Sequence, residues 1–312
     1  MSAADSGQIV SRKNPRRKLA QLAVLAFALC LASNQSVAGA APKLDEKPDI
    51  VYRQVDGDSL QLDAYLQSGQ GPHPAVVYVH GGGFVTGDKR PCPSYVLDNY
   101  ARHSFSIFSV NYRLAPQHPF PAATDDVAAA IAFIKEHAKE LNVDPARMVL
   151  TGESAGGLIT ALVGATLEGE NQVAAVIPLF GETDLELRVS EDPCCMDGHA
   201  SPRPTGGCIS HGLAAFLGFQ EVTSDQDRET LRRASTVTFV RRDMAPYLLI
   251  HGTRDFGVPF EQSVSLQAAM QKCGADCTLL PVVGGGHGNW TPEQWAEVEA
   301  FTFDWLDKHL SH

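Results

Sequence analysis

Short apolar runs recur along the chain from residue 75 onwards, and most are nearly continuous rather than alternating with polar residues. Buried strands of a parallel sheet show this pattern because helices cover both faces of the sheet. Helix-like stretches separate several of the runs, at residues 122–141, 155–167 and 260–271. The sequence therefore predicts an α/β fold with a mostly parallel central sheet flanked by helices. The predicted strands are residues 75–79, 106–110, 148–150, 174–179, 247–250 and 278–283.

The two ends of this pattern differ from its middle. Residues 50–55 and 60–66 alternate apolar and polar side chains around Asp56-Gly57-Asp58, which predicts a β-hairpin before the parallel strands. Residues 291–294 read Thr-Pro-Glu-Gln, which combines an N-cap, a proline in the first turn and a capping box. A final helix should begin there and run to about residue 309.

One long segment, residues 185–240, has no clear period. Its first part combines three cysteines with prolines and a Gly-Gly pair. We interpret it as a cap-like insertion above the sheet, pinned by disulfides and helical after about Thr230.

The N-terminus has the layout of a secretory signal peptide. Five basic residues precede an apolar run at 19–32, which is followed by Ala38-Gly39-Ala40. This order is typical of a signal that is cut after Ala40. The run of about 14 residues is shorter than the roughly 20 that a membrane-spanning helix needs, which favours export over anchoring. Arg16-Arg17 leaves the twin-arginine route open beside the general one, and Cys30 leaves lipid attachment open.

Composition and charge limit the domain number and the partners to be expected of the mature chain, residues 41–312. The full chain of 312 residues is 44% hydrophobic and 20% charged, which is ordinary for one globular domain. Loss of residues 1–40 takes five of 25 basic and one of 36 acidic residues, which leaves a net charge of −15. This negative charge disfavours nucleic acid and anionic membranes as partners. The N-terminal signal predicts an exported protein, periplasmic or secreted. The oligomeric state stays open.

Cysteine usage suggests disulfides. Of seven cysteines, Cys30 would leave with the signal, and an even number in an exported chain favours pairing. Cys273 and Cys277 form the expected pair because Gly274 allows a tight turn between them. The other four would cross-link the insertion to itself and to the loop that carries the first of them; they are Cys92, Cys194, Cys195 and Cys208. No histidine stands at zinc-ligand spacing beside them, so no metal site is expected.

A candidate nucleophile lies in Gly152-Glu153-Ser154-Ala155-Gly156, which follows the predicted strand 148–150 and opens the predicted helix 155–167. A sharp strand-to-helix turn exposes the serine hydroxyl, and glycines flank it because side chains there would clash. The helix N-terminus favours negative charge that develops nearby. The alternative is a structural glycine turn.

A glycine run supplies the matching oxyanion donors. His80-Gly81-Gly82-Gly83-Phe84 comes directly after the strand 75–79, and glycines let backbone N–H groups approach an oxyanion closely. We expect the amides of Gly82, Gly83 and Ala155 to be these donors, and His80 to shape the loop. A phosphate loop is the rival interpretation, but no Lys-Ser/Thr follows the glycines.

A serine nucleophile needs a base, and the base needs an orienting carboxylate. His287 follows the last predicted strand within a glycine-rich loop. Asp255 follows the strand 247–250, at the carboxyl edge where open α/β sheets place their sites. The chain order Ser154, Asp255, His287 is the order of the α/β-hydrolase fold. The weaker candidates are His251, His118 and His211 for the base, and Asp184 and Asp126 for the acid.

Three motifs together resemble the hormone-sensitive-lipase-like bacterial esterases, over about residues 48–308. They are the glycine run 80–84, the segment Tyr112-Arg113-Leu114-Ala115-Pro116 with its continuation 118–126, and Gly152-Glu153-Ser154-Ala155-Gly156-Gly157. The resemblance implies the α/β-hydrolase fold and a serine esterase without a cofactor.

One motif departs from that pattern. Where this family usually carries Asp-Pro-Leu-x-Asp, the chain has His251-Gly252-Thr253-Arg254-Asp255, which is similar to feruloyl-esterase-like and prolyl-oligopeptidase-like branches. We expect a serine carboxylesterase for short-chain esters, on a small molecule or linked to a polysaccharide. The alternatives are an exported polysaccharide deacetylase or feruloyl esterase, an acyl-peptide hydrolase, and a non-enzymatic binding relative.

Overall fold

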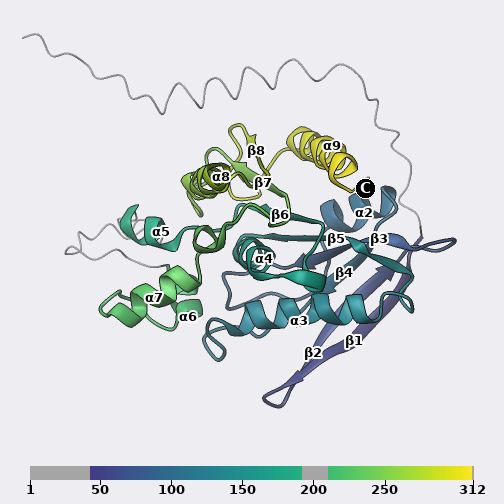
Figure 1. Ribbon diagram of the computed structural model, residues 1–312, viewed down its shortest axis with the longest axis horizontal. Coiled ribbons are helices and arrows are strands. Elements are labelled where there is room, and N and C mark those ends of the chain that lie inside the picture. Colours follow the sequence, from purple (N-terminus) through teal and green to yellow (C-terminus); the bar gives the residue numbers. More distant parts are fainter. Residues whose placement is uncertain (1–42, 192–209, 311–312) are drawn as a thin grey trace, which may run out of the picture. The chain divides into compact units, whose positions relative to one another are not determined.

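The computed structural model describes residues 43–191 and 210–310, all within the unit Ala40–His312. These residues form an eight-stranded sheet in the order β1-β2-β4-β3-β5-β6-β7-β8 (Figure 1). β1 and β2 are antiparallel to their neighbours, and every other neighbouring pair is parallel. The strands are β1 (Asp45–Val55), β2 (Asp58–Leu66), β3 (His73–Val79), β4 (Ser106–Val110), β5 (Val143–Glu153), β6 (Ala175–Leu179), β7 (Tyr247–Gly252) and β8 (Cys277–Val282). The predicted mostly parallel sheet is confirmed.

Helices cover both faces of the sheet. α4 packs on β5 and β6 and against α3, while α2 packs on β4 and against α9 (Figure 1). The helices are α2 (Ser94–Arg102), α3 (Ala122–Glu136), α4 (Ala155–Thr166), α5 (Leu185–Glu191), α6 (His211–Leu217), α7 (Asp225–Arg233), α8 (Glu261–Cys273) and α9 (Pro292–His309). Two short 3-10 turns complete them, η1 (Gly169–Asn171) and η2 (Thr236–Phe239). In the described ranges no helix is long and apolar enough to cross a membrane.

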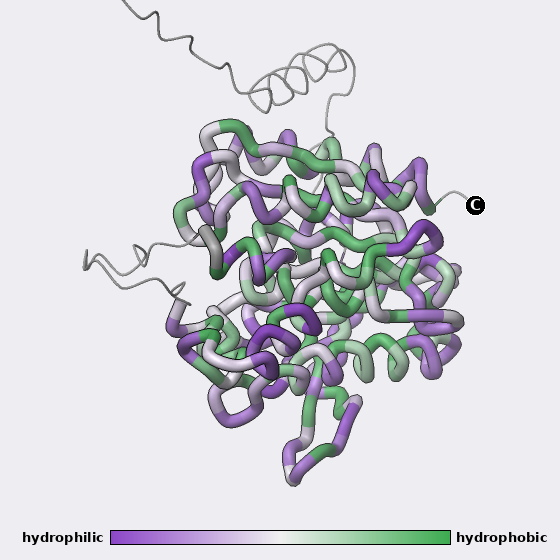
Figure 2. Tube along the Cα trace, turned by 60° about the vertical axis from the view of Figure 1, so that its left-hand side comes forward, coloured by the Kyte–Doolittle hydropathy of each residue, from purple (hydrophilic) through white to green (hydrophobic). Residues whose placement is uncertain are grey.

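The core lies in the middle strands of the sheet. Val77 of β3, Phe108 of β4 and Leu150 of β5 are completely buried, as the continuous apolar runs predict. Figure 2 shows hydrophobic segments in the interior and hydrophilic ones mostly outside them. Burial of each such side chain contributes about 1.5–3 kcal/mol, so these strands hold the site rigidly at their carboxyl ends.

The first and last elements form as their local signals predict. β1 and β2 form a hairpin with Val55 opposite Asp58, and Asp56 and Gly57 both have positive φ, which a two-residue turn of this hand requires. α9 begins at Pro292 with the Thr291 side chain accepting from Gln294 and Gln294 bonding back to Thr291.

The insertion has more helix than the sequence predicts. α6 begins after an N-cap at Ser210, and α7 begins after a capping box between Ser224 and Asp227, so helix starts well before Thr230. The N-cap residues determine where these helices begin. The apolar period of the segment is too weak to predict the helices from hydrophobicity. Residues 192–209, with Cys194, Cys195 and Cys208, lie outside the described residues, as do the expected signal peptide and Cys30.

The expected disulfides of the three described cysteines are wrong. Cys92, Cys273 and Cys277 are free thiols. The Sγ atom of Cys273 donates to the carbonyl oxygen of Met270, 3.2 Å away, so it is directed back along α8. Cys277 lies half-buried on β8, and burial raises the pKa of its thiol to about 12. Cys92 is buried, which raises the pKa of its thiol to about 12, and it is free rather than bridged to the insertion.

Candidate active site

Ser154 occupies a strained turn between β5 and α4. Its φ of 54° and ψ of −120° are unusual for a residue with a side chain, and such strain is characteristic of functional positions. A Cβ at Gly152 would lie 2.7 Å from the carbonyl oxygen of Val79, and one at Gly156 would overlap the same oxygen. The two glycines are therefore required because β3 passes directly beside the turn.

The structure brings Ser154, His287 and Asp255 together from three loops. The Nε2 atom of His287 is 2.8 Å from Ser154 Oγ, and its Nδ1 atom is 2.8 Å from Asp255 Oδ2. Ser154 follows β5, Asp255 follows β7 and His287 follows β8, all at the carboxyl edge of the parallel strands. The three residues form a candidate triad with the connectivity that the sequence predicts.

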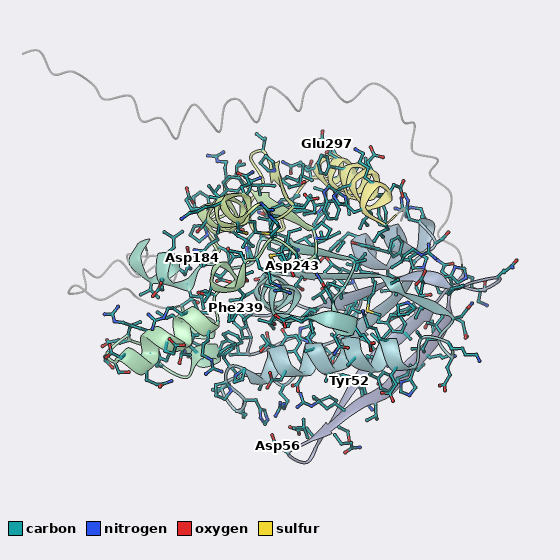
Figure 3. The ribbon with its side chains drawn as sticks, in the orientation of Figure 1. Tyr52, Asp56, Asp184, Phe239, Asp243 and Glu297 are labelled. Carbon is teal, nitrogen blue, oxygen red and sulfur yellow. The ribbon has the colours of Figure 1, made fainter. Side chains whose placement is uncertain are left out.

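Four of the five weaker candidates are positioned elsewhere, and the fifth, His251, lies beside Asp255. The carboxylate of Asp126 pairs with Arg53 and Arg113, and Asp184 precedes α5, where it accepts from Ser265 (Figure 3). His118 lies 3.4 Å from Asp58, and His211 opens α6. His251 is fully buried, as expected for a histidine at a strand end.

Asp255 is held as a carboxylate. Burial by itself raises its pKa, but hydrogen bonds from His251 and His287 and the amide of Val258 outweigh burial and hold the pKa well below the usual value. The amides of Gly257 and Val258 donate to Oδ1 at 2.7 and 2.9 Å, which leaves Oδ2 for His287. The charge on Asp255 is thus fixed in place before any substrate binds.

His287 is oriented as a base towards Ser154. Its Nδ1 atom donates to Asp255, so in the neutral ring Nε2 carries the lone pair that faces the serine hydroxyl. Burial lowers the pKa of His287, but the hydrogen bond and the charge of Asp255 outweigh it and raise the pKa above 6.5. Phe180, after β6, contacts the imidazole edge-to-face at 4.8 Å and limits its rotation.

The glycine run after β3 curls beside Ser154. A Cβ at Gly81 would lie 3.5 Å from the Cβ of Ser154, and Gly82 and Gly83 have φ of 117° and 59°. In the described part of the chain, the amides of Gly82, Gly83 and Ala155 donate to no protein acceptor. All three amides thus remain available to a substrate oxygen, as an oxyanion hole requires.

The insertion helix α6 rests on this loop. A Cβ at Gly212 would overlap the carbonyl oxygen of Gly83, so helix and loop touch through backbone atoms. Phe84, directly after the glycines, stacks on Phe216 of α6 with ring centroids 4.3 Å apart. The cap and the glycine loop therefore form one packed unit.

Comparison with known proteins places the fold and the site in a family. The BD-FAE family model matches residues 62–270, two thirds of the chain. The chain belongs to the BD-FAE family. The match includes the glycine run, Ser154 and Asp255 but ends before His287, so the pairing of that histidine rests on the geometry described above.

Curated relatives of this BD-FAE protein carry esterase names. Esterase LipC of Mycobacterium tuberculosis is 30% identical over 234 residues, 70% of this chain and 53% of the relative. The ethyl acetate hydrolase of Pseudomonas putida is 30% identical over 259 residues, 82% of this chain and 79% of the relative. The chain spans about half the length of LipC and less of several other relatives. The resemblance to hormone-sensitive-lipase-like and feruloyl-esterase-like esterases is confirmed at the level of family.

Solved structures agree on the fold. A truncated form of a carbohydrate esterase from gut microbiota superposes with a TM-score of 0.71 at 24% identity, over 88% of this chain and 100% of the other. At that identity the likeness shows the α/β-hydrolase fold of the BD-FAE protein and nothing finer.

Three residues near the candidate triad have contacts that the sequence did not predict. His251 bonds to Val258 and Ser263 and lies 3.4 Å from Asp255, so it supports the acid. Glu153 accepts hydrogen bonds from Tyr78 and Tyr95 directly behind Ser154. Glu182 is a buried carboxyl after β6 whose pKa is raised by burial, within the field of His287 and Asp255. For Glu182, its position just after a predicted strand was the one feature of the sequence that could have indicated a place near the site.

Proposed function

We propose that this protein is a serine carboxylesterase that cleaves short-chain carboxylic esters through an acyl-enzyme. The observation that carries the proposal is the pair of 2.8 Å contacts that links Ser154, His287 and Asp255. The printed names of the relatives, an esterase and an ethyl acetate hydrolase, favour ester over peptide substrates.

In the proposed mechanism, Ser154 Oγ attacks the ester carbonyl carbon while its proton passes to Nε2 of His287. Asp255 holds the imidazole and stabilises the imidazolium that forms. The amides of Gly82, Gly83 and Ala155 bind the oxyanion. The tetrahedral intermediate collapses and the C–O bond to the alcohol breaks, and the alcohol leaves with the proton from His287. Water then attacks the acyl-enzyme by the same steps and releases the acid.

Short acyl chains are the proposed preference, from acetyl to hexanoyl. The glycine run leads into Phe84, which is buried under α6, and α6 itself has only seven residues. Neither feature supplies the long amphipathic lid that binds a lipid interface. We also propose export to the periplasm or the medium, on the evidence of residues 1–40 alone.

A panel of p-nitrophenyl esters from acetate to palmitate tests the proposal, with an aminoacyl p-nitroanilide as the peptide-like arm. We expect the highest kcat/KM between acetate and hexanoate and no turnover of the anilide. Ser154→Ala is the control variant without the nucleophile. Its kcat should fall about 10⁶-fold, and it should not react with a fluorophosphonate. Its melting temperature should be unchanged. Faster turnover of palmitate than of butyrate would contradict the chain-length preference, and retention of a few per cent activity in the variant would point to another nucleophile.

A further inference from the structure

Glu153, the residue before the nucleophile, contacts three other parts of the chain. Its two carboxylate oxygens accept from different hydroxyls, Oε1 from Tyr78 of β3 at 3.2 Å and Oε2 from Tyr95 of α2. A Cβ at Gly81 would lie 3.4 Å from the Cγ atom of Glu153, so the side chain also packs beside the glycine run. Glu153 therefore joins the serine turn to β3, to α2 and to the glycine run.

The two hydroxyls that bind Glu153 belong to elements held in different ways. Tyr78 lies opposite Thr151 in the parallel pair β3–β5, so backbone hydrogen bonds already hold it beside the serine strand. Tyr95 lies on α2, outside the sheet. A cavity of about 30 Å³, lined by α2, α9 and the strands β5, β6 and β7, leaves the apolar packing beneath Tyr95 incomplete. The Tyr95 hydroxyl thus adds a link between α2 and the serine turn that the sheet does not supply.

The ring of Tyr95 begins a series of aromatic contacts that ends at the base. Tyr95 stacks on Trp295 of α9 with ring centroids 4.5 Å apart, and Trp295 contacts Trp290 at the same centroid distance. Trp290 meets Phe180 edge-to-face at 5.4 Å, and Phe180 meets the imidazole of His287 at 4.8 Å. We call the four side chains before the histidine the aromatic row. Each such pair contributes about 0.5–1.5 kcal/mol beyond the burial of its area.

The aromatic row also holds the backbone on both sides of His287. The Nε1 atom of Trp290 donates to the carbonyl oxygen of Gly286, 2.8 Å away. A Cβ at Gly288 would lie 2.9 Å from the ring of Phe180, so the chain passes directly against that ring. A shift of the row would therefore move the loop that carries the base.

We propose that Tyr95 is a positioning residue for the contact between Ser154 and His287. Its hydroxyl holds the serine turn through Glu153, and its ring holds the base through the aromatic row. The inference rests on the proposed esterase function, because it concerns the same nucleophile and base. Proton transfer across the 2.8 Å contact depends on its geometry, and a misplacement of about 1 Å can cost roughly 100-fold in rate. Acylation and deacylation both use this contact, so loss of the hydroxyl should lower kcat and leave KM nearly unchanged.

Tyr95→Phe and Tyr78→Phe are the matched variants that test the inference, since each removes one hydroxyl from Glu153 and keeps its ring. Kinetics on p-nitrophenyl acetate are compared, with active sites counted by complete labelling with a fluorophosphonate and folding checked by the melting temperature. We expect kcat to fall about tenfold in Tyr95→Phe and to stay within about twofold of wild type in Tyr78→Phe. Equal losses in the two variants, or a loss in Tyr95→Phe that lies in KM, would overturn the inference.

Variants of Glu153 distinguish its hydrogen bonds from its charge. In Glu153→Gln the amide can accept from one tyrosine hydroxyl and donate to the other, whereas Glu153→Leu does neither. We expect kcat within about threefold of wild type for Gln and a loss of about tenfold or more for Leu. The double variant Glu153→Leu/Tyr95→Phe should lose no more than Glu153→Leu alone, because the two residues act as a unit. Equal losses in Gln and Leu would show that charge and not position is responsible, and would overturn the inference.

The rate constant for reaction of Ser154 with the fluorophosphonate separates this inference from the proposed function, because it measures the nucleophile without ester turnover. We expect it to be about tenfold lower in Tyr95→Phe than in wild type. A wild type that reacts with the fluorophosphonate but hydrolyses no ester would overturn the esterase function and leave this comparison intact. An unchanged rate constant in Tyr95→Phe would overturn the positioning role alone.

Discussion

Asp255 and Glu182 follow neighbouring strands of the sheet, β7 and β6, and both residues are buried, with 8% and 6% exposed. Their carboxyl groups nevertheless shift in opposite directions. Burial would raise the pKa of Asp255, but hydrogen bonds from His251, from His287 and from the amide of Val258 hold it low. Burial dominates at Glu182 and raises its pKa, although the charge of Arg188 works against it.

The difference shows that proximity to His287 does not make a carboxyl the partner of a base. A buried carboxylate is stable only where preset donors replace its lost hydration. The turn after β7 supplies two backbone amides to one oxygen of Asp255 and so aims the other at His287. At Glu182, after β6, the backbone donor that lowers the pKa of the carboxyl is its own amide, and it does not offset burial.

Of the changes that test this comparison, Asp255→Asn should have the largest effect. The amide cannot hold His287 in the required tautomer, so kcat on p-nitrophenyl acetate should fall about 10⁴-fold. Because Asn is nearly isosteric, the melting temperature serves as the control for folding. A fall of less than about tenfold would mean that Glu182 or another acid replaces Asp255. It would contradict the claim that only Asp255 is the partner of His287.

A smaller effect is expected in the pH profile of kcat/KM. Only neutral His287 accepts the serine proton, and its pKa lies above 6.5, so activity should fall as pH drops through a midpoint above 6.5. Both carboxylates raise that pKa, Asp255 more than Glu182. The midpoint should therefore move to lower pH in both Asp255→Asn and Glu182→Gln, and further in the first. The reverse order would show that Glu182 is the stronger electrostatic partner.

The smallest effect is expected for Glu182→Gln. Glu182 acts on His287 through its charge alone and less strongly than Asp255 does, so the loss of that charge in the amide should change activity little. Activity should stay within about threefold of wild type at neutral pH. Steady-state kinetics beside Asp255→Asn measure the difference directly, and a loss comparable to that of Asp255→Asn would contradict it.

Those parts of the molecule that local patterns control could be predicted from the sequence. Continuous apolar runs marked the strands, and glycines around Ser154 marked the turn, because their cause lies within a few residues of chain. The positions of Asp255 and His287 after strands 247–250 and 278–283 could be predicted in the same way.

The remaining features depend on contacts between distant segments. Nothing in the local sequence shows that His251 would turn inward to Asp255, or that the thiol of Cys273 would bond to Met270 instead of reaching Cys277. The donors that distinguish Asp255 from Glu182 come from backbone amides, which every residue has and no sequence pattern displays.

The contact of α6 with Gly83 and Phe84 couples substrate selectivity to turnover. A change in the insertion that makes room for larger substrates would also shift the amides that bind the oxyanion. Selectivity and turnover should therefore change together in variants of α6. A library that aims at bulkier esters should leave Gly212 and Phe216 unaltered and vary α7, whose residues take no part in that contact.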